Sequence, residues 1–222
     1  MKRFAVLGAM VGVGIAAVGP TPASAATERC AASTAPGTKI VIASRKAVVY
    51  KRREADPQDG AKQWIHYGCV YARDRERQLT RFVDFSQFLG PWALAGPYVA
   101  YAFDVEEAAG GEQNDEIHVV DLRTGKQKAV ASRAAEGSTQ GESRVHAIVL
   151  KPNATVAWIA SYHLDNSEDV NFQVWAIEQG RDGERRKLDE GTSIRPHSLG
   201  LSGNGKTVYW RAGSETRSAR RR

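Results

Sequence analysis

A pattern of valine, one variable residue and then an aromatic ring occurs four times in this sequence at nearly equal intervals. The copies are Val48/Tyr50, Val99/Tyr101, Val156/Trp158 and Val208/Trp210. They begin 51, 57 and 52 residues apart, and each follows a segment rich in turn-forming residues. A regular period of this length indicates an array of similar supersecondary units. A turn followed by a β-prone segment indicates that each unit is built from antiparallel hairpins.

The variable residue inside each copy is also apolar or aromatic. In sequence order these residues are Val49, Ala100, Ala157 and Tyr209. Side chains on a strand alternate between its two faces, so three such residues in a row make both faces of the strand apolar. A strand of this kind needs cover on both sides. We therefore expect sheets that stack face to face, and a two-sheet sandwich with accidental spacing is the alternative.

Further β-prone segments follow the copies after about 20 residues. They span residues 68–71, 117–122 and 172–177, and residues 127–130 and 187–188 are expected to return as third strands. Turns that contain glycine connect several of these segments, as tight hairpins require. No stretch keeps apolar residues at helical spacing for three turns. We predict an all-β fold, a small or partial β-propeller-like array of about four antiparallel blades.

Two segments extend the repeat into a longer match. Residues 149–158 read VLKPNATVAW and residues 201–210 read LSGNGKTVYW. Both resemble the strand-turn-strand core of the TolB-type, WD40-like propeller repeat, and residues 120–126 resemble its outer hairpin. These phrases and the Ala/Arg/Gly-rich composition also resemble a group of uncharacterised secreted actinobacterial proteins. The resemblance implies a propeller-like fold over residues 39–210 and no particular activity, since propellers carry many unrelated functions.

The chain is short for a propeller, because complete rings have at least about four blades of four strands. If Thr38–Ile42 adds the missing strand to the last sheet, the array closes into a small ring. Otherwise the array is an open arc that exposes an edge strand and an apolar face. An open arc predicts a homodimer, or a complex with a protein or cell-envelope partner.

The N-terminal segment has the pattern of a secretory signal peptide. Lys2 and Arg3 precede an apolar run over residues 4–18, and residues 23–25 (Ala-Ser-Ala) form a small-residue cleavage site. The apolar run is shorter than the roughly 20 residues that span a bilayer. We therefore expect a protein that is secreted, extracellular or associated with the cell envelope, with no transmembrane anchor after signal cleavage.

The chain then divides into a signal peptide (1–25), a β-propeller-like domain (26–212) and a basic C-terminal tail (213–222). The net charge is +6, but residues 26–210 carry 24 basic and 24 acidic residues, so the excess lies at the two ends. A balanced body gives no general argument for nucleic-acid binding, and we predict none. The tail would contact an anionic surface or fray in solvent. Its arginines are Arg217, Arg220, Arg221 and Arg222.

The two cysteines, Cys30 and Cys69, both lie after the signal peptide. Exported chains with two cysteines usually pair them. We predict a disulfide that ties the N-terminal segment to a hairpin strand and closes a loop of about 40 residues. Two buried, unpaired thiols are the alternative.

The histidines show no pairing typical of a metal site. They are His66, His118, His146, His163 and His197, with no H-x-H or H-x-x-x-H spacing. Two groups of acids, Asp104/Glu106/Glu107 and Asp165/Glu168/Asp169, are close in sequence but lack EF-hand spacing. A carboxylate pair or a Ca²⁺ site is the alternative to solvated loop acids. We predict no cofactor and no metal.

These observations favour a non-enzymatic binding or scaffold module at the cell envelope. The polar segments 52–60, 106–116 and 165–169 occupy equivalent places in the repeat and should emerge on one side, where loops on a rigid scaffold carry function. The main alternative is an exported hydrolase or lyase that acts on a polysaccharide or peptide. In that case, acids from Asp104 to Glu107 and from Asp165 to Asp169 would converge with a histidine such as His163.

Overall fold

The computed structural model describes residues 28–56, 60–81, 89–106, 113–136, 143–163, 169–178 and 184–220. These ranges hold a short 3₁₀ helix, η1 (Glu28–Thr34), and fifteen strands in four groups that we call blades 1 to 4. Blade 1 contains β1 (Lys39–Ala43), β2 (Ala47–Ala55), β3 (Lys62–Val70) and β4 (Arg75–Arg81). Blade 2 contains β5 (Leu89–Ala95), β6 (Tyr98–Glu106), β7 (Gln113–Asp121) and β8 (Lys126–Ala131). Blade 3 contains β9 (Ser143–Leu150), β10 (Val156–His163), β11 (Val170–Ile177) and β12 (Arg185–Gly191), and blade 4 contains β13 (Gly200–Leu201), β14 (Thr207–Ala212) and β15 (Glu215–Arg220).

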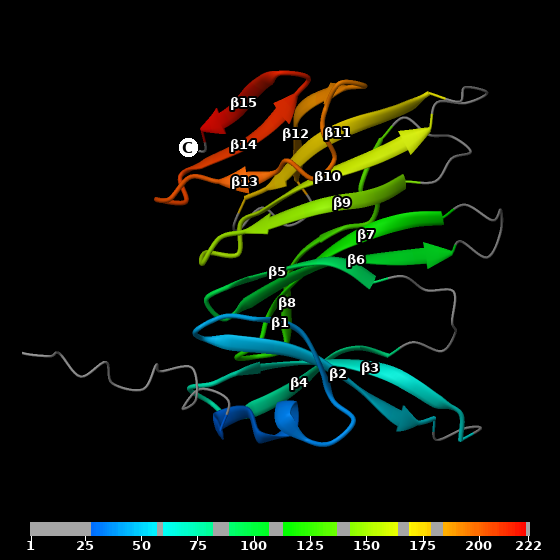
Figure 1. Cartoon of the computed structure of the whole chain (residues 1–222), viewed down its shortest axis with the longest axis vertical. Helices are drawn as coiled ribbons and strands as arrows, with labels where there is room; N and C mark the ends of the chain where they lie inside the picture. The colour runs from blue at the N-terminus through cyan, green and yellow to red at the C-terminus, as the bar shows by residue number, and fades with distance from the viewer. Residues whose placement is uncertain are drawn as a thin grey trace, which may run out of the picture.

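Within each blade, consecutive strands pair antiparallel. Blades 2 and 3 are joined in addition by one parallel pair of residues, Asn114 and Ser143. The blades follow one another from blade 1 at one end of the molecule to blade 4 at the other (Figure 1). The prediction of an all-β, propeller-like array of about four antiparallel blades is therefore confirmed.

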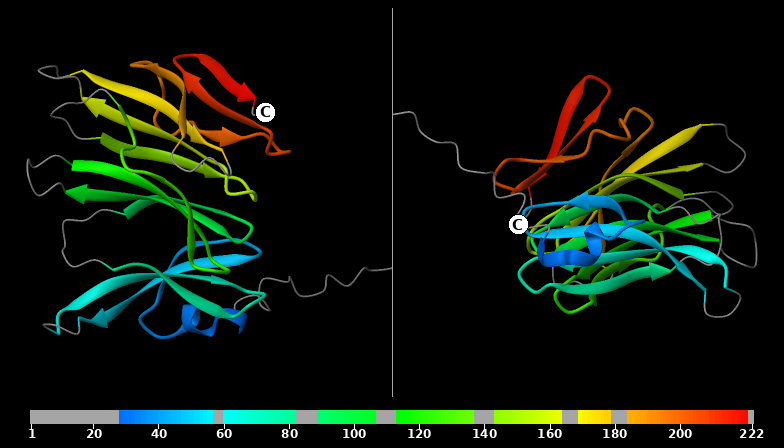
Figure 2. Two further views of the ribbon diagram at one scale, coloured as in Figure 1. Left: turned by 180° about the vertical axis from the view of Figure 1, so that it is seen from behind. Right: turned by 60° about the horizontal axis from the view of Figure 1, so that its bottom comes forward.

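The array is an open arc. The segment that would close a ring, Thr38–Ile42, contributes to β1, which pairs with β2 inside blade 1. Blade 4 keeps three strands, and Figure 2 shows blades 1 and 4 at opposite ends of the arc. Ring closure through Thr38–Ile42 is thus excluded, because β1 is already the first strand of blade 1.

The repeated Val-x-aromatic pattern falls on the second strand of every blade: β2, β6, β10 and β14. Its valine and aromatic ring face the N-terminal end of the array, and the residue between them faces the C-terminal end. In blade 2, for example, Val99 and Tyr101 pack with Val49 of blade 1. Ala100 packs on the opposite side with Val156 of blade 3. The apolar core is therefore a series of layers between blades, which explains why both faces of these strands are apolar.

Three predicted boundaries differ from the structure. Residues 52–55 of the loop predicted over 52–60 belong to β2, and the Gly60 N–H donates to the Asp56 carbonyl at 2.8 Å. Most of the basic tail predicted at 213–222 is β15, joined to β14 by a turn at Gly213 with φ 59°. Charge alone suggested a tail there, whereas the strand is held by its pairing with β14. In the loop predicted over 106–116, Glu106 belongs to β6 and residues 113–116 belong to β7. Residues 57–59, 107–112 and 164–168 of the predicted loops lie outside the described residues.

Candidate functional site

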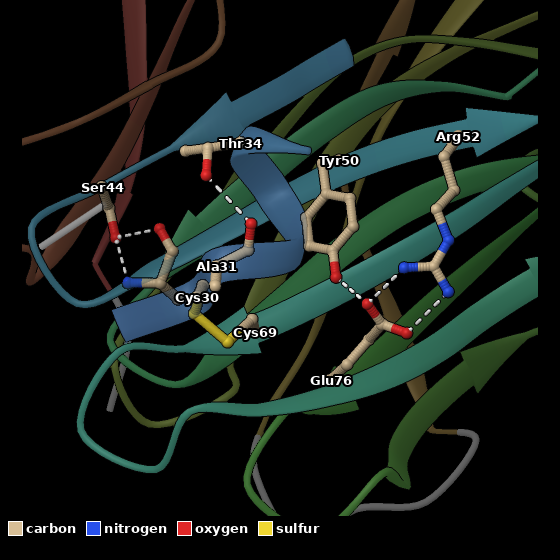
Figure 3. Close-up of a disulfide and its surroundings, with 9 residues drawn as sticks. Cys30, Ala31, Thr34, Ser44, Tyr50, Arg52, Cys69 and Glu76 are labelled. Atoms are coloured by element: carbon tan, nitrogen blue, oxygen red, sulfur yellow. Dashed lines mark hydrogen bonds and ion pairs between the residues drawn. A yellow bond between two sulfur atoms is a disulfide. The ribbon is translucent and has the colours of Figure 1, made fainter. Parts of the chain in front are cut away.

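The disulfide closes the N-terminal end of the array (Figure 3). Cys30 in η1 is bonded to Cys69 in β3, as predicted, with both residues buried. η1 lies on the face of blade 1 that no blade precedes, over a layer that includes Val48, Tyr50 and Tyr67. Disulfides of this kind persist in oxidising compartments. Among the described residues, no helix is long and apolar enough to cross a membrane.

A polar network continues this N-terminal face beyond the disulfide. Arg52 binds Glu76 through both terminal nitrogens, at 2.9 and 3.0 Å, and the Tyr50 hydroxyl donates to the same carboxylate (Figure 3). The Tyr67 hydroxyl donates to Glu54 at 2.6 Å. Burial and the bond to Glu54 raise the pKa of Tyr67 to about 12. Each charge in this network has a partner, so the network stabilises this end of the array.

A groove of about 290 Å³ separates blade 1 from blade 2 on the side of their outer strands. We call it the blade 1–2 groove. It combines flat rings with amide and hydroxyl groups, a mixture typical of small-molecule sites. The side chains that give it this character are Gln78, Thr80, Tyr101, Phe103, His118 and Gln127.

A ladder of stacked rings extends into one wall of the groove, to which it contributes Tyr101 and His118. Trp92, Tyr101 and His118 are cross-strand neighbours on β5, β6 and β7. The ring centroids are 4.8 Å apart for Trp92 and Tyr101 and 5.3 Å apart for Tyr101 and His118. His66 from blade 1 stacks on Trp92 at 5.3 Å, which carries the ladder across the interface. Because neighbouring strands fix each ring, the aromatic wall is rigid before any ligand arrives.

His118 is held by its neighbours rather than free to act as a base. Its Nε2 lies 2.8 Å from Glu116 Oε2, and its Nδ1 lies 3.1 Å from the Gln127 amide nitrogen. The amide can only donate, so Nδ1 accepts and Nε2 carries the proton that is donated to Glu116. Burial, with a smaller contribution from the Glu116 charge, raises the pKa of Tyr101 to about 12. The groove thus presents aromatic rings and amides whose polar atoms are already positioned by hydrogen bonds.

A donor beside the groove has no partner in the described part of the chain. Arg77 lies next to Gly125, which lines the groove. One terminal nitrogen of Arg77 donates to the Arg123 carbonyl at 3.1 Å, while its Nε is buried without a hydrogen bond to described residues. This nitrogen is inaccessible to solvent and Arg77 does not line the groove, so it is a buried polar atom beside the groove and not part of its surface.

The acids proposed for a hydrolase are distributed over different blades. Asp104 of β6 lies opposite Asp115 of β7, and the Val145 N–H donates to Asp115 at 2.5 Å. Burial, with the Asp104 charge as a further cause, raises the pKa of Asp115 to about 6. His163 and Asp169 are exposed at the ends of β10 and β11 in blade 3.

The remaining acids of that hypothesis cannot be located, since Glu107, Asp165 and Glu168 lie outside the described residues. Convergence of the two acidic groups with His163 therefore stays a prediction. Among the described residues, one group of three metal-ligand side chains is close together, namely Cys30, Cys69 and Asp74. Its two sulfur atoms are bonded to each other, so they do not ligate a metal as thiolates.

No pattern in the sequence indicates a contact between His146 and Ser161. The His146 Nε2 lies 2.8 Å from the Ser161 hydroxyl oxygen. Ile159 pairs with Ala147 and Ala160 pairs with Val145, so His146 is the extra residue of a β-bulge in β9. Burial is the main cause that lowers the pKa of His146, with His197 and Arg144 contributing. The contact depends on the register shift between β9 and β10, and this shift can be seen only once the pairing of the two strands is known.

No family model and no curated protein matches this chain. Among solved structures, the chain is similar to an oligogalacturonate lyase in complex with manganese, with 12% identity and a TM-score of 0.45 over 77% of this chain and 44% of that chain. It is also similar to the β-propeller domain of the Trilobed protease from Pyrococcus furiosus, described as having an open velcro topology, with 10% identity and a TM-score of 0.34 over 83% of this chain and 71% of that chain. The chain thus spans less than half the length of the lyase. The strand order and the packing of the blades define the propeller-like fold.

Proposed function

We propose that the protein is a propeller-type binding module, secreted or held at the cell envelope, which binds an oxygen-rich ring compound of the saccharide class in the blade 1–2 groove. The observation that carries this proposal is the lining of the groove, where a rigid aromatic wall faces amide and hydroxyl groups. A sugar ring has an apolar face that suits an aromatic ring and hydroxyl groups that suit amides.

The hydrogen bonds and the chemical types of the groove side chains favour binding over catalysis. Both ring nitrogens of His118 are engaged, by Glu116 and by Gln127. Gln78 and Thr80 supply further polar groups that can bind a hydroxyl without reacting with it. These groups position an oxygen-rich ligand and supply no nucleophile activated by a base.

The location at or outside the cell surface belongs to the same proposal. It is supported by the signal-like sequence of residues 1–25 and by the disulfide between Cys30 and Cys69. The relationship to TolB-type, WD40-like repeat proteins is also part of this proposal. It is supported by residues 149–158 and 201–210, which fall on the first and second strands of blades 3 and 4 with the turn between them.

Isothermal titration of the protein with a neutral disaccharide and with a uronic acid tests the groove. We expect saturable binding of at least one of these probes, and about tenfold weaker binding in Phe103→Ala and Gln127→Ala, since each loses about one well-placed contact. Lys128→Ala is the matched control, because Lys128 is exposed and alternates with Gln127 along β8. Absence of binding by both probes, or equal weakening in the control, would overturn the proposal. A thermal unfolding curve for each variant shows that the fold is retained.

A further inference from the structure

The last blade differs from the others at the position between the repeated valine and aromatic residue. Val49, Ala100 and Ala157 are fully buried under the blade that follows. The equivalent residue of blade 4, Tyr209, is 39% exposed. Blade 4 is the last sheet at its end of the arc (Figure 2), and the described residues contain no fifth blade to cover the face that carries Tyr209.

Blade 4 is also incomplete at its outer edge. Blades 1, 2 and 3 each end in a fourth strand, whereas the outermost strand of blade 4 is β15. One edge of β15 pairs with β14 through six residue pairs, from Thr207/Arg220 to Ala212/Glu215. Within the described ranges, no strand pairs with its other edge. That edge presents backbone donors and acceptors, which are the groups that an added strand uses.

The side chains around this edge carry uncompensated positive charge. In the β14–β15 register, Arg220 lies opposite Thr207 and Thr216 lies opposite Arg211, so both arginines share the open face with Tyr209. The described residues supply no acidic partner for either arginine. Glu215, the one acid in β15, lies opposite Ala212 and so projects to the other face. There it accompanies Arg217, which binds Asp189 of blade 3 at 3.0 Å.

We propose that β15 accepts an extended acidic segment of a partner protein as the fourth strand of blade 4, with acidic side chains on the face of Arg211 and Arg220. The backbone edge supplies affinity, and the two arginines select the charge of the segment. A partner strand at this position completes the blade in the way that β4, β8 and β12 complete the others.

A second copy of the chain is a poorer occupant than an acidic segment. Two copies of β15 that pair about a two-fold axis keep each residue on its own face of the joint sheet. Arg220 of one copy would therefore lie beside Thr216 or Ser218 of the other and never beside Glu215. The joint face would gather four arginines without an acid, which is unfavourable at low salt.

Fluorescence anisotropy with labelled octapeptides tests this proposal on the full chain. We expect binding of a peptide with alternating Glu and Val, and little binding of its Lys/Val counterpart or of the acidic peptide N-methylated at alternate residues, which lacks strand-edge donors. Amide hydrogen exchange across Glu215–Arg220 should slow when the acidic peptide binds.

Charge reversal gives the second arm of the test. Arg211→Glu/Arg220→Glu should weaken binding of the acidic peptide by about 25-fold at low salt, from two exposed pairs of about fivefold each, and should create affinity for the Lys/Val peptide. Arg186→Glu, an exposed arginine of β12, is the matched control. Equal binding of the N-methylated peptide, no binding of the acidic peptide, or a dimer in solution that protects Glu215–Arg220 would overturn the proposal. Phe103→Ala should leave this binding unchanged, which separates it from the blade 1–2 groove.

Discussion

Substitution of Gly68 tests how closely blades 1 and 2 pack against each other. A Cβ atom at Gly68 of β3 would lie 2.4 Å from Cδ2 and 3.2 Å from Cδ1 of Leu122, which follows β7. Leu122 is 1% exposed and has little room to move. Gly68→Ala therefore overfills the layer and should reduce the free energy of unfolding by about 1–3 kcal/mol. Leu122→Ala alone leaves a cavity and should cost about 2–5 kcal/mol.

The double variant Gly68→Ala/Leu122→Ala shows whether positions 68 and 122 are in direct contact. The new methyl group occupies space that the leucine vacates, so the combined loss should be smaller than the sum of the single losses by about 1–2 kcal/mol. Urea unfolding followed by tryptophan fluorescence measures the four free energies. Gly203→Ala is the control, since a Cβ there meets nothing within 4 Å, and it should change stability by less than about 0.5 kcal/mol. Additive losses, or a Gly68→Ala loss no greater than the control, would refute the close packing of the two blades.

Two further predictions concern the disulfide and a buried acid. Replacing both Cys30 and Cys69 by serine removes a link across a sequence separation of 39 and should lower the free energy of unfolding by about 4 kcal/mol, and an unchanged midpoint in calorimetry would contradict this. For Asp115, burial raises the pKa to about 6, so the folded state holds the proton more tightly than the unfolded state. The resulting stability is fully present below about pH 4 and is lost as the pH rises through about 6. Asp115→Asn, which keeps an acceptor for the Val145 N–H, should lack this decline when urea midpoints are compared from pH 4 to 8, and parallel profiles for the two proteins would show that Asp115 is not responsible.

The repeat predicted the blades because each copy of it falls on the second strand of one blade, which packs between two apolar layers in the middle of the array. Val-x-aromatic strands are apolar on both faces, and this property follows from residue type alone. The first strands were harder to recognise. β5 contains Pro91, which the usual rules exclude from a strand interior, and the structure accommodates it where the register shifts between Leu89 and Trp92. β13 is only two residues long and gives no periodic signal.

The candidate sites were less predictable than the fold. The disulfide followed from cysteine number and context, which sequence provides directly. The blade 1–2 groove brings together Gln78 and Gln127, which are 49 residues apart, and their proximity depends on how two blades dock. The sequence pattern instead favoured acids in loops as functional residues. Asp115, which was included in such a loop, is a buried residue of β7 that accepts a hydrogen bond from the Val145 N–H of blade 3.

The two ends of the array solve the same physical problem differently. Repeat arrays must cover or polarise their terminal faces, because each internal unit relies on its neighbours to bury apolar surface. The N-terminal face stays apolar and is covered by η1, which the disulfide fixes in place. The C-terminal face is uncovered and carries a polar residue instead. At the position after the repeated aromatic residue, blades 2 and 3 bury Ala102 and Ile159, whereas blade 4 exposes Arg211. A partner that packs on this face must therefore either place an acid beside Arg211 or leave the Arg211 guanidinium in contact with water. A strand added at the edge of β15 can do either. A sheet that covered the whole face would remove more of the arginine from water and would therefore cost more desolvation free energy.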